Sequence, residues 1–437
     1  MNPAKKLDEL SRRSFLANTA NTAFGVTLGG AAASWFNSAE AAEAIAQSKG
    51  KAKHVIYLYM SGGMTHIDTF DPKPDAPEAY RGPIKAISTN VAGIQLGQHL
   101  EKTAKHADKM CLVRSMNSTQ GAHAQGNYNV HTSYTMRSSI THPTLGSWAN
   151  KLEPSRLKQT LPPYVTVHTA NNHAGAGFFE PNSGPLPVGD AVMGLQNSKR
   201  RREVTEADFN RQIALRSKLD QDFTDRFSKG QRSVRAYDEM FNSAVKLMSS
   251  KDLEAFDLSK ESKGTHAAYG SDKFSKGVLL SRRLVEHGVR FVEVQFGGFD
   301  WHSDNFTKAE EKLPILDQAY AALLTDLKQR GLLESTLVVI ATEFGRTPKI
   351  DDDAGRNHFP KAFSFALAGA GIKGGTVYGK TDETASNVIT KKTTPADFNA
   401  TIASAMGLSH DQVVFSPSKR PFKMGGKEGQ PIKEILA

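Results

Sequence analysis

Two consecutive units of helix, glycine and strand lie in the second half of the chain, and this alternation constrains the fold more than any other feature. A helical pattern over residues 277–287 leads to an apolar strand over residues 289–296. A second helix over residues 314–330 leads to the β-branched run over residues 337–341. A glycine follows each helix, as in a left-handed C-cap. Because short, wholly apolar runs are typical of strands buried on both faces, the repeated unit predicts a parallel sheet.

Polar side chains follow both of these strands. Glu343 and Arg346 come directly after residues 337–341, and His358 follows across a loop. The strand over residues 289–296 is followed by Asp300, His302 and Asp304. In open α/β sheets, ligands bind at the carboxyl ends of the strands. We therefore predict that these segments form one wall of an active site.

Two earlier segments repeat this arrangement. Residues 55–60 read as a strand, and Ser61-Gly62-Gly63 turns the chain sharply before His66 and Asp68. These residues suit a ligand pocket, and a structural turn closed by Asp71-Pro72 explains them equally well. A further strand over residues 110–113 leads through a polar loop to His123, at the start of a helix over residues 124–136. A histidine at this position is either a helix-capping or packing residue or part of a functional site. The second alternative arises because the free N–H groups of a helix N-terminus favour an anion.

The remaining segments complete the predicted chain. Residues 171–190 are rich in Gly, Asn and Pro and predict a long irregular loop. Residues of about 200–260 predict a helical insertion lying against the sheet, with an apolar stripe of Leu215, Leu219, Phe223 and Phe227. Residues 363–367 predict a strand, and residues 369–379 a turn into a hairpin. A last helix is predicted to begin at Thr394-Pro395, with a capping threonine.

Histidine and carboxylate side chains together form the ligand set of Zn, Mn or Fe. The predicted divalent-metal ligands are Asp300, His302, His358, Glu343, His66 and Asp68. A metal there would polarise a phosphoryl or sulfuryl oxygen and supply hydroxide near neutral pH. Arg346 would bind an anionic group through two parallel hydrogen bonds. The substrate class predicted by this set is a small anionic ester.

The N-terminal segment predicts export. Arg12 and Arg13 form a twin-arginine pattern, followed by a mildly apolar, small-residue stretch and two A-x-A-like cleavage motifs within residues 39–44. We therefore predict a twin-arginine signal peptide over residues 1–44, the twin-arginine translocase as a partner during export, and a periplasmic location. Polar residues interrupt the apolar stretch, so no stable membrane anchor is expected. Cys111 is the only cysteine and is expected to be a buried thiol.

The chain carries a formal net charge of +10, and residues 1–44 contribute none of it, with four basic and four acidic side chains. Part of the excess clusters at Lys199-Arg200-Arg201-Arg202. No aromatic residue interleaves with this run, so we predict no nucleic-acid partner. The run reads as a solvated face, and steering of an anionic substrate is the alternative.

Four sequence blocks, over residues 58–74, 269–305, 341–348 and 355–379, together resemble a large bacterial family of exported proteins. That family is catalogued as a domain of unknown function among the sulfatase-like members of the alkaline-phosphatase-like superfamily. The resemblance covers nearly the whole of residues 50–437. It implies a three-layer α/β/α sandwich around a mostly parallel sheet, and metal-dependent hydrolysis or transfer of phosphate or sulfate esters.

The same resemblance implies which residues match the superfamily's site and where this chain differs from it. Asp300, His302 and His358 match one metal position. The superfamily's Asp-His pair becomes Glu343-Phe344, and the aspartate that ends its first strand is Ser61 here. Its nucleophile falls near His123, with Ser118 and Thr119 just upstream. One metal position is therefore retained and the second is altered.

Together these observations predict a periplasmic metal-dependent hydrolase of phosphate or sulfate esters. Glu343 would be a ligand or general base, and His123 a nucleophile or an acid–base group. The alternative is a non-catalytic secreted binding protein that retains the hydrolase fold. The altered nucleophile and Glu343-Phe344 favour that alternative.

Overall fold

The computed structural model describes residues 51–153, 159–169, 173–196, 198–227 and 232–437. The chain divides into two units, residues 1–49 and residues 50–437. The predicted signal peptide over residues 1–44 lies outside the described residues. Among the residues described, no helix combines the length and apolar character needed to cross a membrane.

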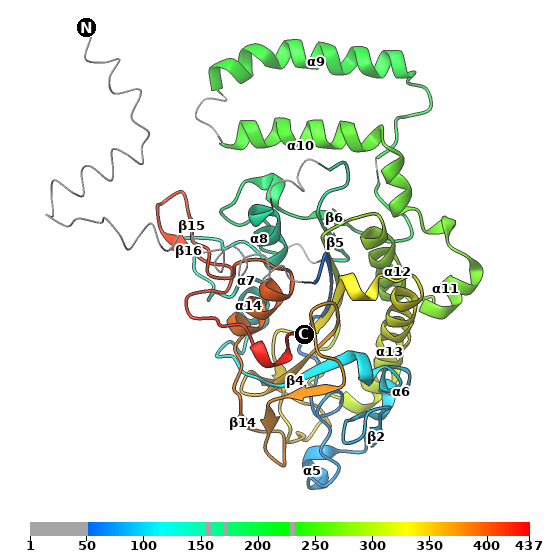
Figure 1. The fold of residues 1–437 in the computed structure, drawn as a ribbon, viewed down its shortest axis with the longest axis vertical. Helices are drawn as coiled ribbons and strands as arrows, with labels where there is room; N and C mark the ends of the chain where they lie inside the picture. The colour runs from blue at the N-terminus through cyan, green and yellow to red at the C-terminus, as the bar shows by residue number, and fades with distance from the viewer. Residues whose placement is uncertain (1–50, 154–158, 170–172, 197, 228–231) are drawn as a thin grey trace, which may run out of the picture. The chain divides into compact units, whose positions relative to one another are not determined.

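An eight-stranded sheet forms the centre of the larger unit (Figure 1). Its strands stand in the order β12, β4, β11, β8, β1, β7, β5, β6. Their bounds are Thr376–Tyr378, Met110–Met116, Phe363–Gly369, Thr336–Ala341, His54–Met60, Phe291–Phe296, Tyr164–Val167 and Leu186–Val188. Strand β11 is antiparallel to β4 and β8, and the other neighbouring pairs are parallel. The predicted mostly parallel sheet is confirmed.

The central strand β1 separates two hydrophobic cores because its side chains alternate between the faces of the sheet. Ile56 and Leu58 face a core with helices α12 (Lys273–Glu286) and α13 (Asn305–Gln329). Tyr57 and Tyr59 face the other core. That core contains side chains of helices α7 (His123–Thr132), α8 (Leu145–Leu152) and α14 (Pro395–Ala405). Helices therefore cover both faces, which confirms the predicted three-layer α/β/α sandwich.

Local sequence signals account for the ends of these helices. The side chain of Asp272 accepts a hydrogen bond from the Phe274 N–H at the start of α12, and Gly288 follows its end with a φ of +93°. At α14, Thr394 and Asp397 form a reciprocal capping box, as the predicted capping threonine requires. Cys111 is fully buried in β4, as predicted.

The predicted start of one helix is wrong. Helix α13 begins at Asn305, nine residues before its predicted start, and Pro314 lies inside it. Burial of the early turns, including Ala309 and Leu313, stabilises the helix although Pro314 lacks a hydrogen-bond donor. Residues 369–379 contain β12, which pairs in parallel with β4, and an antiparallel pair of β13 (Lys380–Thr381) and β14 (Val388–Thr390) follows them, in agreement with the predicted turn into a hairpin.

The region of about 200–260 contains helices α9 (Glu206–Phe227) and α10 (Arg232–Met248) (Figure 1). Helix α10 contacts the 3-10 helices η4 (Pro181–Ser183) and η5 (Lys251–Phe256), whereas α9 contacts α10. Leu215 and Leu219 are 57% and 70% exposed, so the predicted packing of their stripe against the sheet is wrong. A four-residue repeat drifts by about 40° per step around a helix, so its members leave a common face. The side chains of Phe223 and Phe227 lie outside those described.

Shorter elements connect these layers. Their bounds are η1 Gln98–Leu100, η2 Ala107–Lys109, η6 Leu258–Lys260, η7 Leu333–Ser335, η8 Lys433–Ile435, α5 Glu78–Arg81, α6 Glu101–Ala104, α11 Lys263–Tyr269, β2 Ala86–Ser88, β3 Gln95–Gly97, β9 Gly345–Arg346, β10 His358–Phe359, β13 Lys380–Thr381, β14 Val388–Thr390, β15 Val414–Phe415 and β16 Pro421–Phe422. Within the predicted irregular loop over residues 171–190, η4 and β6 are ordered elements.

Candidate metal centre

The polar segments that follow β7 and β8 emerge at the same edge of the sheet. Both strands are parallel to β1 and flank it, so their carboxyl ends lie side by side. After β8, the two-residue strand β9 pairs with β10, which places His358 opposite Arg346. The loop from β4 reaches the same edge, because the Gly121 carbonyl oxygen lies 2.9 Å from Nδ1 of His358. The structure thus brings together Asp300, His302, His358, His123, Glu343 and Arg346.

The Asp300 carboxylate lies at the middle of this group. Its Oδ1 atom is 2.9 Å from Nε2 of His302 and 3.2 Å from Nε2 of His358. Its Oδ2 atom is 3.2 Å from Nε2 of His123, within ion-pair distance but without hydrogen-bond geometry. Partial burial opposes ionisation of Asp300, but the hydrogen bond and charge of Arg346, together with the neighbouring His123 and His358, outweigh it and hold the pKa of Asp300 well below its ordinary value.

The three imidazoles share one orientation. In each, Nδ1 lies against an oxygen atom, at 2.9 Å from Gly121 O for His358, 2.9 Å from Asn357 Oδ1 for His302 and 2.8 Å from Glu343 Oε1 for His123. An oxygen acceptor at Nδ1 favours the tautomer with the proton on Nδ1, in which Nε2 can serve as a metal ligand, as in metal-bound histidines. All three Nε2 atoms face Asp300. This donor set fits a divalent metal ion.

Glu343 is a buried orienting group for His123. Its carboxylate accepts hydrogen bonds from the Tyr59 hydroxyl at 3.0 Å and from the Gly62 N–H at 2.8 Å. Burial of Glu343 by itself would raise its pKa, but the hydrogen bonds from His123 and Gly62 outweigh it and lower the pKa. In return, the hydrogen bond to Glu343 raises the pKa of His123. His123 is therefore a polarised imidazole, 37% exposed, at the start of α7.

Arg346 is not placed to bind an anionic substrate, which corrects the sequence prediction. Its guanidinium is fully buried and donates to the carbonyl oxygens of Gly62, Gly63 and Arg356. It also donates to Asp300, and Nη1 lies 3.4 Å from Nε2 of His302. These contacts use its N–H groups, so Arg346 positions Asp300.

His66 and Asp68, predicted as metal ligands, lie in a separate buried network. The Asp68 carboxylate is fully buried and accepts two hydrogen bonds from Arg356, at 2.9 and 3.0 Å, and one from Asn305 at 2.9 Å. Nε2 of His66 lies 2.9 Å from the Ala385 carbonyl oxygen, and burial lowers the pKa of the ring. The structural alternative left open by the sequence is therefore the observed one. Asp304 is exposed at the N-cap of α13.

Ser118 and Thr119, the hydroxyls predicted to lie near a nucleophile position, line a cavity beside α7. Ser118 Oγ accepts a hydrogen bond from the Gln120 N–H and lies 3.4 Å from Oδ1 of Asn129. Among the described residues, neither hydroxyl forms a hydrogen bond with Asp300 or the three imidazoles. From this segment, His123 is the group that reaches the cluster.

Sequence reasoning missed a second cluster of histidine and carboxylate, at the C-terminal end of α7. Glu293 of β7 is buried between His131 and His173, with oxygen–nitrogen distances of 3.2 and 3.3 Å. The three ligand atoms lie within 4.8 Å of one another. However, Nδ1 of His173 accepts the Gly175 N–H at 3.2 Å, so its Nε2 carries the proton that points at Glu293. Because the His173 nitrogen that would bind a metal carries a proton, we interpret this cluster as a hydrogen-bonded network and not as a metal site. Its sequence signal is a glutamate in the middle of an apolar strand.

Solved structures similar to this chain share little sequence with it. They include the PsFucS1 sulfatase from Pseudoalteromonas sp., at 14% identity, covering 87% of this chain and 79% of that chain with a TM-score of 0.37. The lipoteichoic acid synthase LtaP from Listeria monocytogenes has 10% identity, coverages of 88% and 80%, and a TM-score of 0.34. Alkaline phosphatase from the Antarctic bacterium TAB5 has 11% identity, coverages of 75% and 95%, and a TM-score of 0.33.

No curated protein matches the sequence. Residues 52–436 match the model of one protein family, which spans nearly all of the larger unit. The sequence resemblance to a domain of unknown function is thereby confirmed, and the chain belongs to the family described as "Protein of unknown function (DUF1501)".

Proposed function

We propose that this protein is an exported metal-dependent hydrolase of phosphate or sulfate esters. The observation that carries the proposal is the common orientation of His123, His302 and His358, each with Nδ1 against an oxygen and Nε2 facing Asp300. Imidazoles oriented in this way around one carboxylate are typical of a metal centre. Asp300, His302 and His358 would hold the ion.

A divalent metal held there would polarise a phosphoryl or sulfuryl oxygen and supply hydroxide near neutral pH. The chain's own residues account for the rest of the chemistry. His123 is partly exposed, and Glu343 holds its proton on Nδ1, so Nε2 is the atom that accepts or donates a proton at the substrate. Arg346 keeps Asp300 ionised and in place.

The proposal is tested by metal content and turnover together. The full chain is purified after cytoplasmic expression, its metals are quantified by mass spectrometry, and hydrolysis of p-nitrophenyl phosphate and p-nitrophenyl sulfate is measured. We expect bound Zn, Mn or Fe in the wild type, with metal and turnover lost in His302→Ala/His358→Ala. His287→Ala, an exposed histidine at the end of α12, is the matched control and should keep both. A wild type without metal or turnover would overturn the hydrolase proposal.

A non-catalytic binding protein is the second candidate, and one contact favours it. Arg346 donates to the same Asp300 oxygen that faces His302 and His358, so a positive charge already accompanies the carboxylate. This charge opposes a cation at that oxygen. Wild-type protein that contains no bound metal and turns over neither ester would support this candidate.

We also propose that the protein is exported to the periplasm, on the basis of Arg12 and Arg13 and the stretch that follows them. Replacing both arginines by lysine keeps the charge and removes the twin-arginine pattern. The variant should accumulate in the cytoplasmic fraction of the host, whereas the wild type should appear in the periplasmic fraction. Equal distribution of the two proteins would contradict this assignment.

A further inference from the structure

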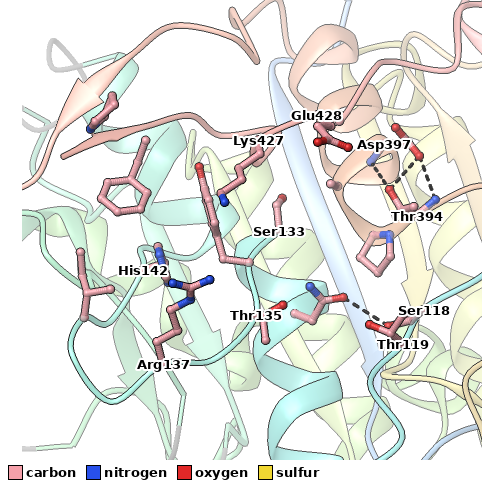
Figure 2. Close-up of a pocket in the computed structure, with 18 of the residues that line it drawn as sticks. Ser118, Thr119, Ser133, Thr135, Arg137, His142, Thr394, Asp397, Lys427 and Glu428 are labelled. Carbon is pink, nitrogen blue, oxygen red and sulfur yellow. Dashed lines mark hydrogen bonds between the residues drawn. The ribbon is translucent and has the colours of Figure 1, made fainter.

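A cavity of about 740 Å³ lies beside α7 and is lined by residues that the chemistry above does not use (Figure 2). Its volume falls in the range of small-molecule binding sites. Its walls come from the loop before α7, the C-terminal end of α7, the start of α14, and the segments 420–422 and 427–429. Segments far apart in sequence thus converge on it.

Three cations lie on this cavity without a partner. Arg137, Arg420 and Lys427 are exposed, and within the described part of the chain none of them forms an ion pair. Two carboxylates also line the cavity. Both oxygens of Asp397 are engaged, since they accept the Thr394 N–H and hydroxyl and the Gln430 N–H. These hydrogen bonds do not remove the charge of Asp397, so the lining carries three cations against two carboxylates, and its net charge of +1 favours an anionic ligand.

The floor of the cavity is aromatic. The rings of Tyr134 and His142 stack with centroids 4.3 Å apart and planes 6° from parallel, and Phe422 packs edge-on against both. Burial and the nearby Arg137 lower the pKa of His142 to about 4, so the ring is neutral at neutral pH. A neutral aromatic floor suits the apolar face of a ring and does not itself attract an anion.

Hydroxyl and amide groups occupy the remaining wall. Figure 2 shows Ser118 and Thr119 across the cavity from Arg137 and His142, with Ser133 and Thr135 between them. The Ser133 hydroxyl donates to Met424 O and accepts from Asn399, so Ser118, Thr119 and Thr135 are the uncharged groups that can pair with hydroxyl groups of a ligand. The cavity thus combines aromatic rings, hydroxyl groups and three cations. Together these groups suit one ligand class, a saccharide that carries acidic substituents.

The cavity is joined to the metal centre by one short loop. Thr119 lines the cavity and His123 faces Asp300, and four residues span roughly 14 Å at most. The segment after β9 holds this loop along its length, since the Ser118 N–H donates to Pro360 O at 2.8 Å and Gly121 O lies 2.9 Å from His358. The loop therefore has a fixed position between the cavity and the centre.

From this arrangement we infer that the cavity binds an acidic saccharide, with Arg137, Arg420 and Lys427 as its anion-binding residues. Resting on the proposed function, the inference names the substrate class as a sulfated or phosphorylated sugar whose ring occupies the cavity and whose ester reaches the metal centre.

Calorimetric binding of a sulfated disaccharide, its unsulfated counterpart and a nucleoside monophosphate tests the inference. We expect the sulfated disaccharide to bind the wild type, and Arg137→Ala/Arg420→Ala to weaken this binding at least about tenfold. Lys199→Ala/Arg200→Ala removes the same charge from exposed positions outside the cavity and should change the Kd less than about twofold. Equal weakening by both variants, equal binding of the unsulfated sugar, tighter binding of the nucleotide, or no binding would each overturn the inference.

The same titration with His302→Ala/His358→Ala separates this inference from the hydrolase proposal. Binding that persists in that variant, without metal or turnover in any form of the protein, would leave the cavity assignment standing and remove the hydrolase. Metal and turnover without saccharide binding would remove only the cavity assignment.

Discussion

Nδ1 of His123 lies 2.8 Å from Oε1 of Glu343, a contact that joins the start of α7 to the end of β8. Replacing Glu343 by glutamine tests this relationship. The amide would place its NH₂ group against donors from Tyr59, Gly62 or His123, so we expect about 1–3 kcal/mol of lost stability. Removal of an orienting carboxylate should also lower metal affinity or turnover about 10–100-fold.

The measurement is metal competition and p-nitrophenyl ester hydrolysis at a temperature where circular dichroism shows the Glu343→Gln variant folded. Glu334→Gln, at an exposed position in η7, is the matched control and should behave as the wild type. Unchanged turnover and affinity in Glu343→Gln would show that this contact does not orient His123.

A second prediction concerns the buried pair of Asp68 and Arg356, both of which are fully buried. Asp68→Ala leaves the guanidinium without its counter-charge, so we expect a loss of about 3–5 kcal/mol in the free energy of unfolding, measured by urea titration. Metal content should stay at the wild-type level, because Asp68 lies outside the centre. Asp108→Ala, which removes an exposed ion pair with Lys109, should cost less than about 1 kcal/mol. Loss of metal with stability preserved would return Asp68 to the ligand set.

A third prediction distinguishes the two histidine–carboxylate clusters. Because a proton occupies the ligand position of His173, Glu293→Gln should leave the metal-to-protein ratio unchanged while lowering thermal stability. In contrast, His302→Ala/His358→Ala should abolish metal binding. A ratio that falls by one ion in Glu293→Gln would identify the buried cluster as a second metal site.

A fourth prediction follows from His142, whose pKa is lowered to about 4 by burial and by Arg137. An unfolded histidine titrates near 6.5, so between pH 6.5 and 4 the unfolded chain binds the proton first. Stability should therefore be full above pH 6.5 and decline as the pH falls through this window, by up to ~3 kcal/mol at its lower end.

His142→Gln should flatten this part of the stability–pH curve relative to the wild type, as measured by urea unfolding at pH 7.5, 5.5 and 4.5. His287→Gln removes an exposed histidine and should leave the slope unchanged. Parallel curves for His142→Gln and the wild type would contradict the assigned pKa.

Periodicity predicted the elements whose signals are local. The strands β1, β7 and β8 and the helices α12 and α14 carry their apolar pattern and their caps within a few residues, so the sequence was sufficient to place them. The pairing of β12 with β4 and the reversed direction of β11 depend on contacts between distant segments. No local pattern distinguishes these pairings from a hairpin.

The candidate site also depends partly on local sequence signals and partly on contacts between distant segments. Residues at the ends of neighbouring parallel strands meet because the sheet brings them together, so Asp300, Glu343 and His358 could be expected at one place. Asp68 has the same chemistry and a similar setting in the sequence, but its partner Arg356 is 288 residues away. Whether a buried carboxylate faces a guanidinium or an ion pocket is decided by that partner, which the surrounding sequence does not specify.

The placement of β1 at the centre of the sheet has a consequence for synthesis of the chain. Val55 pairs with Phe291, and His54 pairs with Thr336, so both neighbours of β1 emerge from the ribosome long after β1 itself. The end of β7 is synthesised 236 residues after the end of β1, so at about 5–20 residues per second β1 presents two open edges for roughly 12–47 s. During that interval an apolar strand can join the strands of other nascent chains. Productive folding of this protein therefore requires that β1 be shielded until translation is almost complete, which makes chaperone occupancy of the N-terminal half a determinant of yield.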